Sequence, residues 1–478
     1  MIQLFSDRER ELQFLESHYK TRQPELLVIY GRRRVGKTEL SLRFAENKPH
    51  IYFLADRRPE PYLIRELKTM MSRYLGDDSF AKLAVNDWID LFQEFTKWNK
   101  TEHTLMIIDE FPVLIETNRA IPSIFQKIWD QNLKHTHTTL ILLGSSVSMM
   151  ETEVLDIRSP LYGRRTAQWK LEPLQLTHLK PFFPRYDIEA LAQVYGCLGG
   201  VPAYLHKFDQ KLGFWENVEQ RILMKGEYLY QEAEFLLREE LREPRYYAAI
   251  LQAVAQGARN YSEILDQTSM EKSMLSKYIS VLEDLGFTKR VYPLGAKPKP
   301  RKGQYTIADN YLGFWFRYLF PNKTDLETGK TSPTLNRIRQ DYNTYMGRAF
   351  EDISLELLNE MKLRQLLPFT YTRIGKWWYR ETEIDLIATE EQKREAAFIE
   401  VKWSTVNKQG AKRILNSLSS KATEFRWERE KEKYGIIAKS LPGKQDLRDE
   451  GYVALDLKDF EQTLNRGTMP HPQIHPDT

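Results

Sequence analysis

The sequence predicts an α/β fold for its first ~150 residues, built as a doubly wound parallel sheet. Four short apolar runs there are continuous rather than alternating, which is typical of strands buried on both faces of a parallel sheet. Amphipathic stretches separate the runs, as crossover helices would, and a glycine-rich turn follows the first run directly. The predicted strands are Leu26–Tyr30, Ile51–Leu54, Leu105–Ile108 and Leu140–Leu143.

The turn after the first strand, residues 31–38, reads G-x-x-x-x-G-K-T, and a helical stretch from Glu39 to Ala45 follows it. Glycines at these positions let backbone N–H groups face phosphates, the lysine reaches the β- and γ-phosphates, and the threonine hydroxyl ligates Mg²⁺. The pattern in this context therefore predicts a site for ATP with Mg²⁺. The predicted nucleotide-binding residues are Gly31, Arg34, Val35, Gly36, Lys37 and Thr38.

The third predicted strand is followed by Asp109 and Glu110. The carboxyl end of a parallel strand lies beside the phosphates, so we expect Asp109 to bind Mg²⁺ together with Thr38, and Glu110 to polarise the attacking water. Ser145 follows the fourth strand and is a candidate contact for the γ-phosphate or the water. A plain strand-end turn is the alternative for Ser145.

Two adjacent arginines, Arg164 and Arg165, precede a further apolar-rich strand. An arginine placed at a γ-phosphate stabilises the charge of the transition state, so either residue is a candidate arginine finger. A finger that acts in trans requires a homo-oligomer, which is therefore expected. Ordinary surface arginines are the alternative.

From about Trp169 to Arg245 the pattern becomes helical, and a winged helix-turn-helix is expected after it. The expected elements are helices at Tyr246–Gln256, Tyr261–Asp266 and Ser269–Asp284 and a strand at Phe287–Tyr292. The apolar residues at helical spacing in the third helix are Leu275, Ile279, Leu282 and Leu285. Its opposite face carries Lys272, Ser273, Ser276, Lys277 and Ser280.

The segment from Gly286 to Gly303 contains basic residues and no acid, so it is suited to follow DNA phosphates while the third helix enters a major groove. Its basic residues are Lys289, Arg290, Lys297, Lys299, Arg301 and Lys302. DNA is therefore an expected partner. The alternative is a protein–protein spacer with solvated lysines, and Glu271, Glu283 and Asp284 disfavour tight base readout.

Two segments near the C-terminus, 381–387 and 397–402, are expected to pair as a β-hairpin through the polar turn between them. In an antiparallel pair Asp385 and Glu400 lie close together on one face, and Lys402 points to the same side as Glu400. Two carboxylates and a lysine can hold Mg²⁺ and orient or deprotonate a water. Glu351, near the start of an upstream helix, is a candidate third carboxylate. Surface salt bridges across a hairpin are the alternative.

Several motifs resemble the archaeal-type branch of the AAA+ ATPases. They are Phe5–Leu12, the glycine-rich turn, Asp109-Glu110, Gly144-Ser145-Ser146, Leu161–Arg165 and Gly199–Pro202. The resemblance implies that Phe5 and Arg8 lie near the adenine. Many members of that group carry an arginine sensor in the lid, but the stretch after Gly200 reads Val-Pro-Ala-Tyr and offers none.

The C-terminal carboxylates resemble the PD-(D/E)xK restriction-endonuclease-like fold, which cleaves phosphodiesters. Asp385, Glu400 and Lys402 match its core triplet and Glu351 its helix-borne acid, although Ile384 stands where the pattern has proline. The order of the whole chain resembles archaeal-type ATPases whose C-terminal domain of unknown function has this nuclease-like core. Residues 305–318 and 375–378 also look like that family, and their aromatic side chains are expected to form packing contacts.

Composition restricts the remaining possibilities. The chain has 478 residues with a net charge of +4, so only local basic clusters favour nucleic acid. Its single cysteine, Cys197, rules out an internal disulfide and fits a reducing cytoplasm. No apolar leader or membrane-spanning run is apparent, so a cytoplasmic protein without membrane contact is expected.

The predicted fold class is α/β: a P-loop AAA+ doubly wound parallel sheet with a helical lid, a winged helix-turn-helix, and a C-terminal α/β restriction-endonuclease-like domain. The predicted parts are the ATPase domain 1–168, the lid 169–244, the winged helix 245–304, connecting helices 305–344, the nuclease-like domain 345–464 and a flexible tail 465–478.

The leading functional hypothesis is an ATPase that binds DNA and regulates a Mg²⁺-dependent nuclease activity. In this hypothesis Glu110, Arg164, Arg165 and Lys402 carry the catalytic roles. The first alternative is an ATP-dependent DNA-binding regulator without nuclease activity. The second is a signalling or scaffold ATPase for proteins.

Overall fold

The computed structural model describes residues 8–99, 103–297 and 303–465. The chain forms two compact units. Unit 1 comprises Met1–Pro173 with Val201–Ala203, and unit 2 comprises Leu174–Gly200 with Tyr204–Thr478. In the described residues no helix combines the length and the apolar character that crossing a membrane requires.

Unit 1 is built on a five-stranded sheet in the order β2-β3-β4-β1-β5, and all neighbouring strands are parallel. Its strands are β1 Glu25–Tyr30, β2 His50–Leu54, β3 Thr104–Asp109, β4 Thr138–Gly144 and β5 Ala167–Lys170. Every residue of β1, β3 and β4 is buried. The predicted parallel sheet is therefore confirmed, and the continuous apolar runs are its doubly covered strands.

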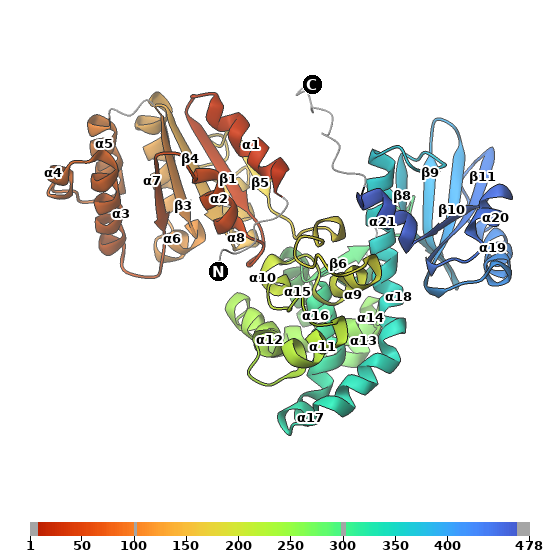
Figure 1. The fold of residues 1–478 in the computed structure, drawn as a ribbon. Coiled ribbons are helices and arrows are strands. Elements are labelled where there is room, and N and C mark those ends of the chain that lie inside the picture. The colour runs from red at the N-terminus through yellow and green to blue at the C-terminus, as the bar shows by residue number, and fades with distance from the viewer. Residues whose placement is uncertain (1–7, 100–102, 298–302, 466–478) are drawn as a thin grey trace. The chain divides into compact units, whose positions relative to one another are not determined.

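Helices cover both faces of this sheet (Figure 1). They are α1 Glu9–Lys20, α2 Lys37–Ala45, α3 Glu60–Leu75, α4 Asp78–Ala81, α5 Trp88–Trp98, α6 Phe111–Thr117, α7 Ile121–Gln131 and α8 Val147–Met149. Alternate residues of β1 separate the two cores. Leu26 and Val28 share a cluster with residues of α3, α5 and α7, whereas Leu27 and Ile29 share one with residues of α1 and α2.

Unit 2 begins with a helical segment and continues into three helices and a small antiparallel sheet. The helical segment contains α9 Ile188–Leu198, α11 Phe214–Asn217 and α12 Tyr228–Glu240, while α10 Pro202–Leu205 begins in unit 1 and ends in unit 2. The following elements are α13 Pro244–Gln256, α14 Tyr261–Thr268, α15 Lys272–Asp284, β6 Thr288–Val291 and β7 Gln304–Ile307. Leu275, Ile279 and Leu282 of α15 are buried, as their helical spacing predicts, and Leu285 is half-buried.

The C-terminal part of unit 2 holds a mixed sheet in the order β12-β11-β10-β9-β8. Its strands are β8 Arg373–Tyr379, β9 Thr382–Glu390, β10 Glu395–Thr405, β11 Lys431–Ser440 and β12 Val453–Asp456. Strand β9 is antiparallel to both β8 and β10, while β11 is parallel to both β10 and β12. The β9–β10 pairing confirms the predicted hairpin.

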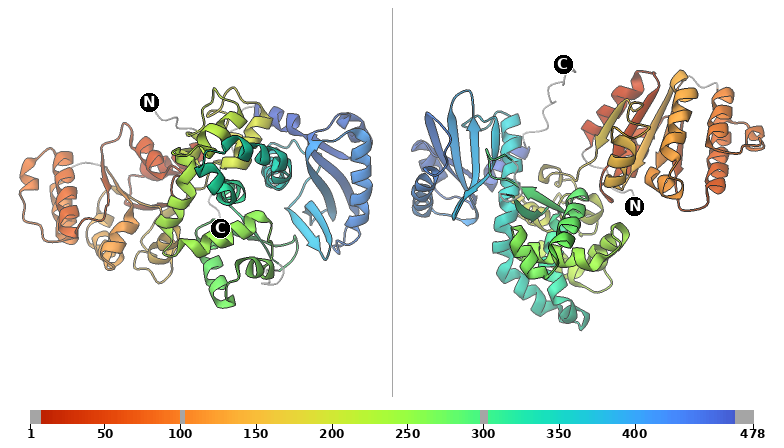
Figure 2. Two further views of the ribbon diagram at one scale, coloured as in Figure 1. Left: turned by 90° about the horizontal axis from the view of Figure 1, so that it is seen from below. Right: turned by 180° about the vertical axis from the view of Figure 1, so that it is seen from behind.

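The remaining helices of unit 2 are α16 Asn310–Phe314, α17 Lys323–Glu327, α18 Thr331–Leu363, α19 Lys408–Ala422, α20 Lys444–Asp449 and α21 Leu457–Asn465. In the right view of Figure 2 the long α18, in cyan, runs beside the C-terminal sheet, and it packs against β10. The aromatic side chains of Tyr311, Phe314, Trp315 and Phe316 are buried, which confirms their expected packing role.

All five internal boundaries expected from the sequence fall within a continuous helix or strand, those after 244 and 464 at the ends of α13 and α21. The boundary at 168 falls inside β5, where Trp169 pairs with Ile29 of the ATPase sheet. The boundary at 304 falls inside β7, and the boundary at 344 falls in the middle of α18. Strands β5 and β7 are held by hydrogen bonds to other strands, which local composition does not reveal. Helix α18 continues through 344 by hydrogen bonds between residues four apart.

Candidate functional site

The glycine-rich turn lies between β1 and α2, and its two glycines have backbone conformations that favour glycine. Gly31 has φ +156° and Gly36, which precedes α2, has φ +95°. A Cβ atom on Gly31 would lie 2.3 Å from the carbonyl oxygen of Leu171, so the backbone packs too closely there for a side chain. Lys37 Nζ donates to the carbonyl oxygens of Gly31 and Arg32, at 2.8 Å each.

Thr38 and Asp109 meet at the carboxyl end of β3. Thr38 Oγ1 donates to Asp109 Oδ2 at 2.6 Å, and Tyr52 OH donates to the same oxygen at 2.8 Å. Asp109 is 1% exposed. A buried carboxylate and a hydroxyl oxygen at one point fit Mg²⁺, which prefers oxygen ligands and retains several waters. Sequence reasoning missed Tyr52, whose pKa is raised by burial and by the charge of Asp109.

Glu110 occupies a strained backbone position directly after β3, with φ +54°. Its carboxylate accepts a hydrogen bond from Ser145 Oγ at 2.6 Å, and its backbone N–H donates to Asp109 Oδ1 at 2.8 Å. Because β3 and β4 are neighbours, their ends bring Glu110 and Ser145 together. The predicted γ-phosphate contact Ser145 is thus, in this structure, the residue that orients Glu110.

Both candidate finger arginines contact their own domain. Arg164 pairs with Asp130 at 3.0 Å, and Arg165 lies over the Tyr162 ring with 4.6 Å between guanidinium and ring centroid. Near the glycine-rich turn, Arg8 donates to the Val35 carbonyl oxygen at 3.1 Å. Phe5, the other residue implied to lie near the adenine, is outside the described residues.

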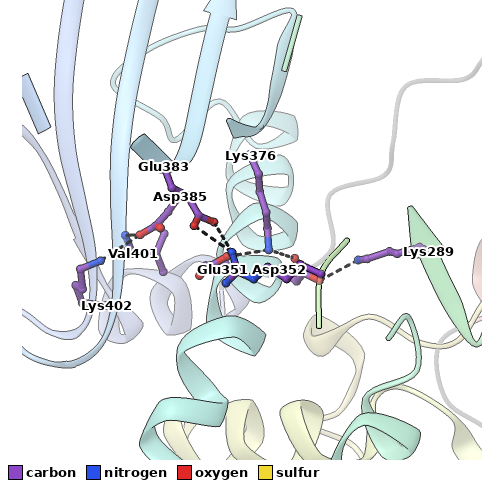
Figure 3. Close-up of polar contacts among 9 residues, drawn as sticks. Lys289, Glu351, Asp352, Lys376, Glu383, Asp385, Val401 and Lys402 are labelled. Atoms are coloured by element: carbon purple, nitrogen blue, oxygen red, sulfur yellow. Dashed lines mark hydrogen bonds and ion pairs between the residues drawn. The ribbon is translucent and has the colours of Figure 1, made fainter. Parts of the chain in front are cut away.

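Asp385 and Glu400 lie one residue beyond Leu386 and Ile399, the last pair of the β9–β10 ladder, and Lys402 contacts both acids. Lys402 Nζ lies 3.2 Å from Asp385 Oδ2 and 2.7 Å from Glu400 Oε2. The backbone N–H of Val401 donates to Asp385 Oδ2 at 2.7 Å. Figure 3 shows Lys402, Val401 and Asp385 together at this point of the sheet. The structure therefore gathers the predicted triplet.

Asp385 and Glu400 are two acids close enough for the charge of one to shift the pKa of the other. Burial and the charge of Glu400 raise the pKa of Asp385 to about 7, while Lys402 opposes the rise. Burial acts in the same direction on Glu400, but Lys402 and Lys421 lower the pKa of Glu400 below its ordinary value. Two adjacent carboxylates that repel each other fit a divalent cation, whose charge would favour ionisation of both.

Sequence reasoning also missed Lys421 of α19, whose Nζ lies 2.6 Å from Glu400 Oε1. No spacing rule identifies it, since α19 packs on the sheet only in the folded chain.

The expectation that Glu351 completes a three-carboxylate metal site is wrong for the described residues, in which no group of three or more His, Cys, Asp or Glu is placed to hold a metal. Lys376 of β8 holds Glu351 instead, at 2.8 Å, and holds Asp352 at 2.9 Å (Figure 3). Burial raises the pKa of Glu351, and Lys376 opposes the rise. The carboxylate that the sequence pattern assigns to a metal ion is therefore paired with the Lys376 ammonium instead.

The outward face of α15 is exposed at every predicted position: Lys272, Ser273, Ser276, Lys277 and Ser280. A hollow of about 660 Å³ lies between α14, α15 and the β6–β7 hairpin. Its lining includes Tyr261, Ser276, Ser280, Arg290 and Tyr305.

Lys289 lies on β6 of the β6–β7 hairpin. Its side chain forms an ion pair with Asp352 of α18 at 2.9 Å, so its charge is already partnered within unit 2. A second ion pair, Arg259 with Glu383 at 3.1 Å, also joins the three-helix segment to the C-terminal sheet. Lys297 is exposed. The other predicted wing residues, Lys299, Arg301 and Lys302, lie outside the described residues.

Comparison with known proteins places this architecture. Residues 5–208 match the family described as ATPase domain predominantly from Archaea, and residues 315–414 match one described as Archaea bacterial proteins of unknown function. The uncharacterised protein MJECL04 of Methanocaldococcus jannaschii is 38% identical over 457 residues, which cover 96% of this chain and 100% of that protein. The chain belongs to this family of archaeal-type ATPases with a C-terminal domain of unknown function, and its nucleotide is ATP.

Other likenesses are shorter or more distant. An uncharacterised ATP-binding protein of the same organism, MJ0423, is 49% identical over 47 residues, 10% of this chain and 80% of that protein. The Walker-type ATPase PABY2304 of Pyrococcus abyssi is similar in structure, with a TM-score of 0.49 and 23% identity over 65% of this chain and 96% of that chain. The ORC2 protein of Aeropyrum pernix has a TM-score of 0.41 and 14% identity over 68% and 95%. At these scores the structural likenesses carry no conclusion about function.

Proposed function

We propose that this ATPase binds DNA and controls a metal-dependent cleavage of DNA at the β9–β10 hairpin. This hairpin carries Asp385 and Glu400 and is called the carboxylate hairpin below. The single observation that carries the proposal is the meeting of Asp385, Glu400 and Lys402, with Lys402 Nζ within 3.2 Å of both acids. ATP use follows from the family to which the chain belongs, whereas DNA binding and cleavage are proposed here.

At the nucleotide site, Lys37 binds the β- and γ-phosphates, while Thr38 and Asp109 hold Mg²⁺. Glu110, oriented by Ser145, accepts a proton from the attacking water. Arg164 or Arg165 supplies an arginine finger to a second copy of the chain, which requires that its present contact be released. The homo-oligomer is therefore part of the proposal.

At the carboxylate hairpin, Asp385 and Glu400 hold Mg²⁺, which when bound supplies Lewis acidity and a more acidic water. Lys402 Nζ donates to that water or to a phosphate oxygen and so orients the nucleophile. Burial and the charge of Glu400 raise the pKa of Asp385, and a divalent cation held by the two acids would favour the ionised form of both.

The three-helix segment and its hairpin act as a winged helix-turn-helix in this proposal. The exposed Lys272 and Lys277 lie beside small serines on α15, which suits close approach to a duplex. Ion pairs from Arg259 and Lys289 to the C-terminal part link this segment to the carboxylate region, which supports control of one by the other.

A DNA-binding regulator without nuclease activity is the second candidate. The observation that favours it is the sparse set of acids, because no third carboxylate joins Asp385 and Glu400 in the described residues. A lysine also pairs with each of those two acids.

The deciding experiment is a cleavage assay on duplex, single-stranded and branched DNA with Mg²⁺ or Mn²⁺, with and without ATP. We expect the parent chain to cut, Asp385→Ala and Lys402→Ala to lose cutting, and Lys37→Ala to change only its ATP dependence. Lys393→Ala, at the exposed turn of the same hairpin, is the matched control for Lys402. If DNA is bound but never cut, the regulator is correct; if Lys402→Ala cuts like the parent, the assigned site is wrong.

A further inference from the structure

The Glu400 carboxylate is held by two lysines, one on each oxygen. Lys402, two residues along β10, contacts Oε2 at 2.7 Å, and Lys421, from α19, contacts Oε1 at 2.6 Å. The Glu400 side chain is only 6% exposed, whereas Lys421 is 35% exposed. Glu400 is therefore buried in the sheet, while both lysines reach it from more exposed positions.

The two lysines differ in what each also contacts. Lys402 Nζ bridges Asp385 and Glu400, so it remains attached to the site through Asp385 even if Glu400 changes partner. Among the described residues, Lys421 forms an ion pair with Glu400 and none with Asp385. A divalent cation bound by Glu400 through Oε1 competes with the Lys421 ammonium, because the two positive groups repel each other and are drawn to the same oxygen.

We propose that Lys421 is a second lysine of the carboxylate site, which holds Oε1 of Glu400 while no divalent cation is bound and contacts a DNA phosphate once a cation has taken that oxygen. The proposal rests on the proposed function, since it uses the same metal site and the same nucleic-acid substrate. In the first state Lys421 neutralises a buried acid. In the second state the Lys421 ammonium no longer pairs with Glu400 and is available to contact a DNA phosphate.

The same helix provides a matched control. Lys412 lies nine residues before Lys421, about two and a half turns, and therefore on the opposite face of α19. It pairs with Glu450 at 2.9 Å, and its 46% exposure is comparable. Replacing either lysine by methionine keeps the apolar stem and removes one positive charge, so only the position differs.

The first measurement is the affinity of the full-length chain for Mn²⁺, by electron paramagnetic resonance, in a buffer without nucleotide or DNA. We expect Lys421→Met to bind Mn²⁺ at the hairpin about three- to tenfold more tightly than the parent, because no lysine competes for Oε1. Lys412→Met should match the parent. The Lys37→Ala, Thr38→Ala background removes the nucleotide-site cation from the signal.

The second measurement is the affinity for a DNA duplex, by fluorescence anisotropy, with Ca²⁺ and with EDTA. Lys421→Met should bind DNA about three- to tenfold more weakly than the parent with Ca²⁺ and equally well in EDTA, because without a cation Glu400 retains the lysine. A plain surface lysine produces the same deficit in both buffers. Lys421→Arg should retain most of the Ca²⁺-dependent affinity.

These outcomes separate the inference from the proposed function. A chain that binds DNA with this metal-dependent pattern but does not cut refutes the nuclease and leaves the role of Lys421 intact. Equal Mn²⁺ affinity of Lys421→Met and Lys412→Met overturns the inference, as does a DNA deficit that persists in EDTA or a complete absence of DNA binding.

Discussion

A buried acid on α18 offers a quantitative test of how unit 2 is held together. Glu356 Oε1 accepts from the Leu176 N–H at 2.6 Å, and its Oε2 accepts from Tyr195 OH of α9 at 2.8 Å. Burial raises the pKa of Glu356 from 4.5 to about 7, although these hydrogen bonds favour the ionised form. We therefore predict that Glu356→Gln stabilises the protein at alkaline pH.

The sign and the size follow from proton linkage. Between the two pKa values the folded state binds the proton more tightly than the unfolded state, so stability falls as pH rises from about 4.5 through 7. Each pH unit between them corresponds to about 1.4 kcal/mol, which sets an upper limit of about 3 kcal/mol above pH 8. Structural relaxation reduces the expected gain of the neutral glutamine to about 1–2 kcal/mol.

The assay is thermal unfolding of the full chain at pH 5 and pH 8. We expect Glu356→Gln to raise Tm by several degrees at pH 8, at about 2 °C per kcal/mol for a unit of this size, and by much less at pH 5. Glu360→Gln is the control, since Glu360 lies one turn further along α18 in an ordinary pair with Arg364 at 2.6 Å. An equal gain at both pH values, or none at pH 8, refutes the reasoning.

Two further predictions concern close packing and the DNA segment. Gly200→Ala should lower the stability of unit 2 by at least about 3 kcal/mol in urea unfolding, because its Cβ would lie 1.6 Å from the Leu174 carbonyl oxygen. Gly347→Ala, whose Cβ meets nothing within 4 Å, should not destabilise. Asp352→Asn should release Lys289, raise DNA affinity about two- to fivefold at low salt and steepen the salt slope by about one.

The Gly200 prediction fails if both alanine variants unfold alike. The Asp352 prediction fails if affinity and salt slope equal those of Glu360→Gln, which removes an acid from the same helix without touching Lys289.

The sequence alone determined the parts that depend on neighbouring residues. The turn from Gly31 to Thr38 is contiguous, and its strand and helix follow from local patterns, so the ATP site was predictable. The pairing of Asp385 with Glu400 was also predictable, because the short polar turn between β9 and β10 limits the register of the hairpin. The alternation along β10 then fixed the side on which Lys402 lies.

Only the tertiary structure decided which groups from distant segments complete these sites. Tyr52 reaches Asp109 because β2 and β3 are neighbours in the sheet, and Lys421 reaches Glu400 because α19 packs on β10 and β11. Lys376 reaches Glu351 because β8 forms the edge of the sheet beside α18, which removes Glu351 from the predicted metal site. Such contacts depend on strand order and helix packing, which result from burying apolar faces across the whole chain rather than from any local spacing.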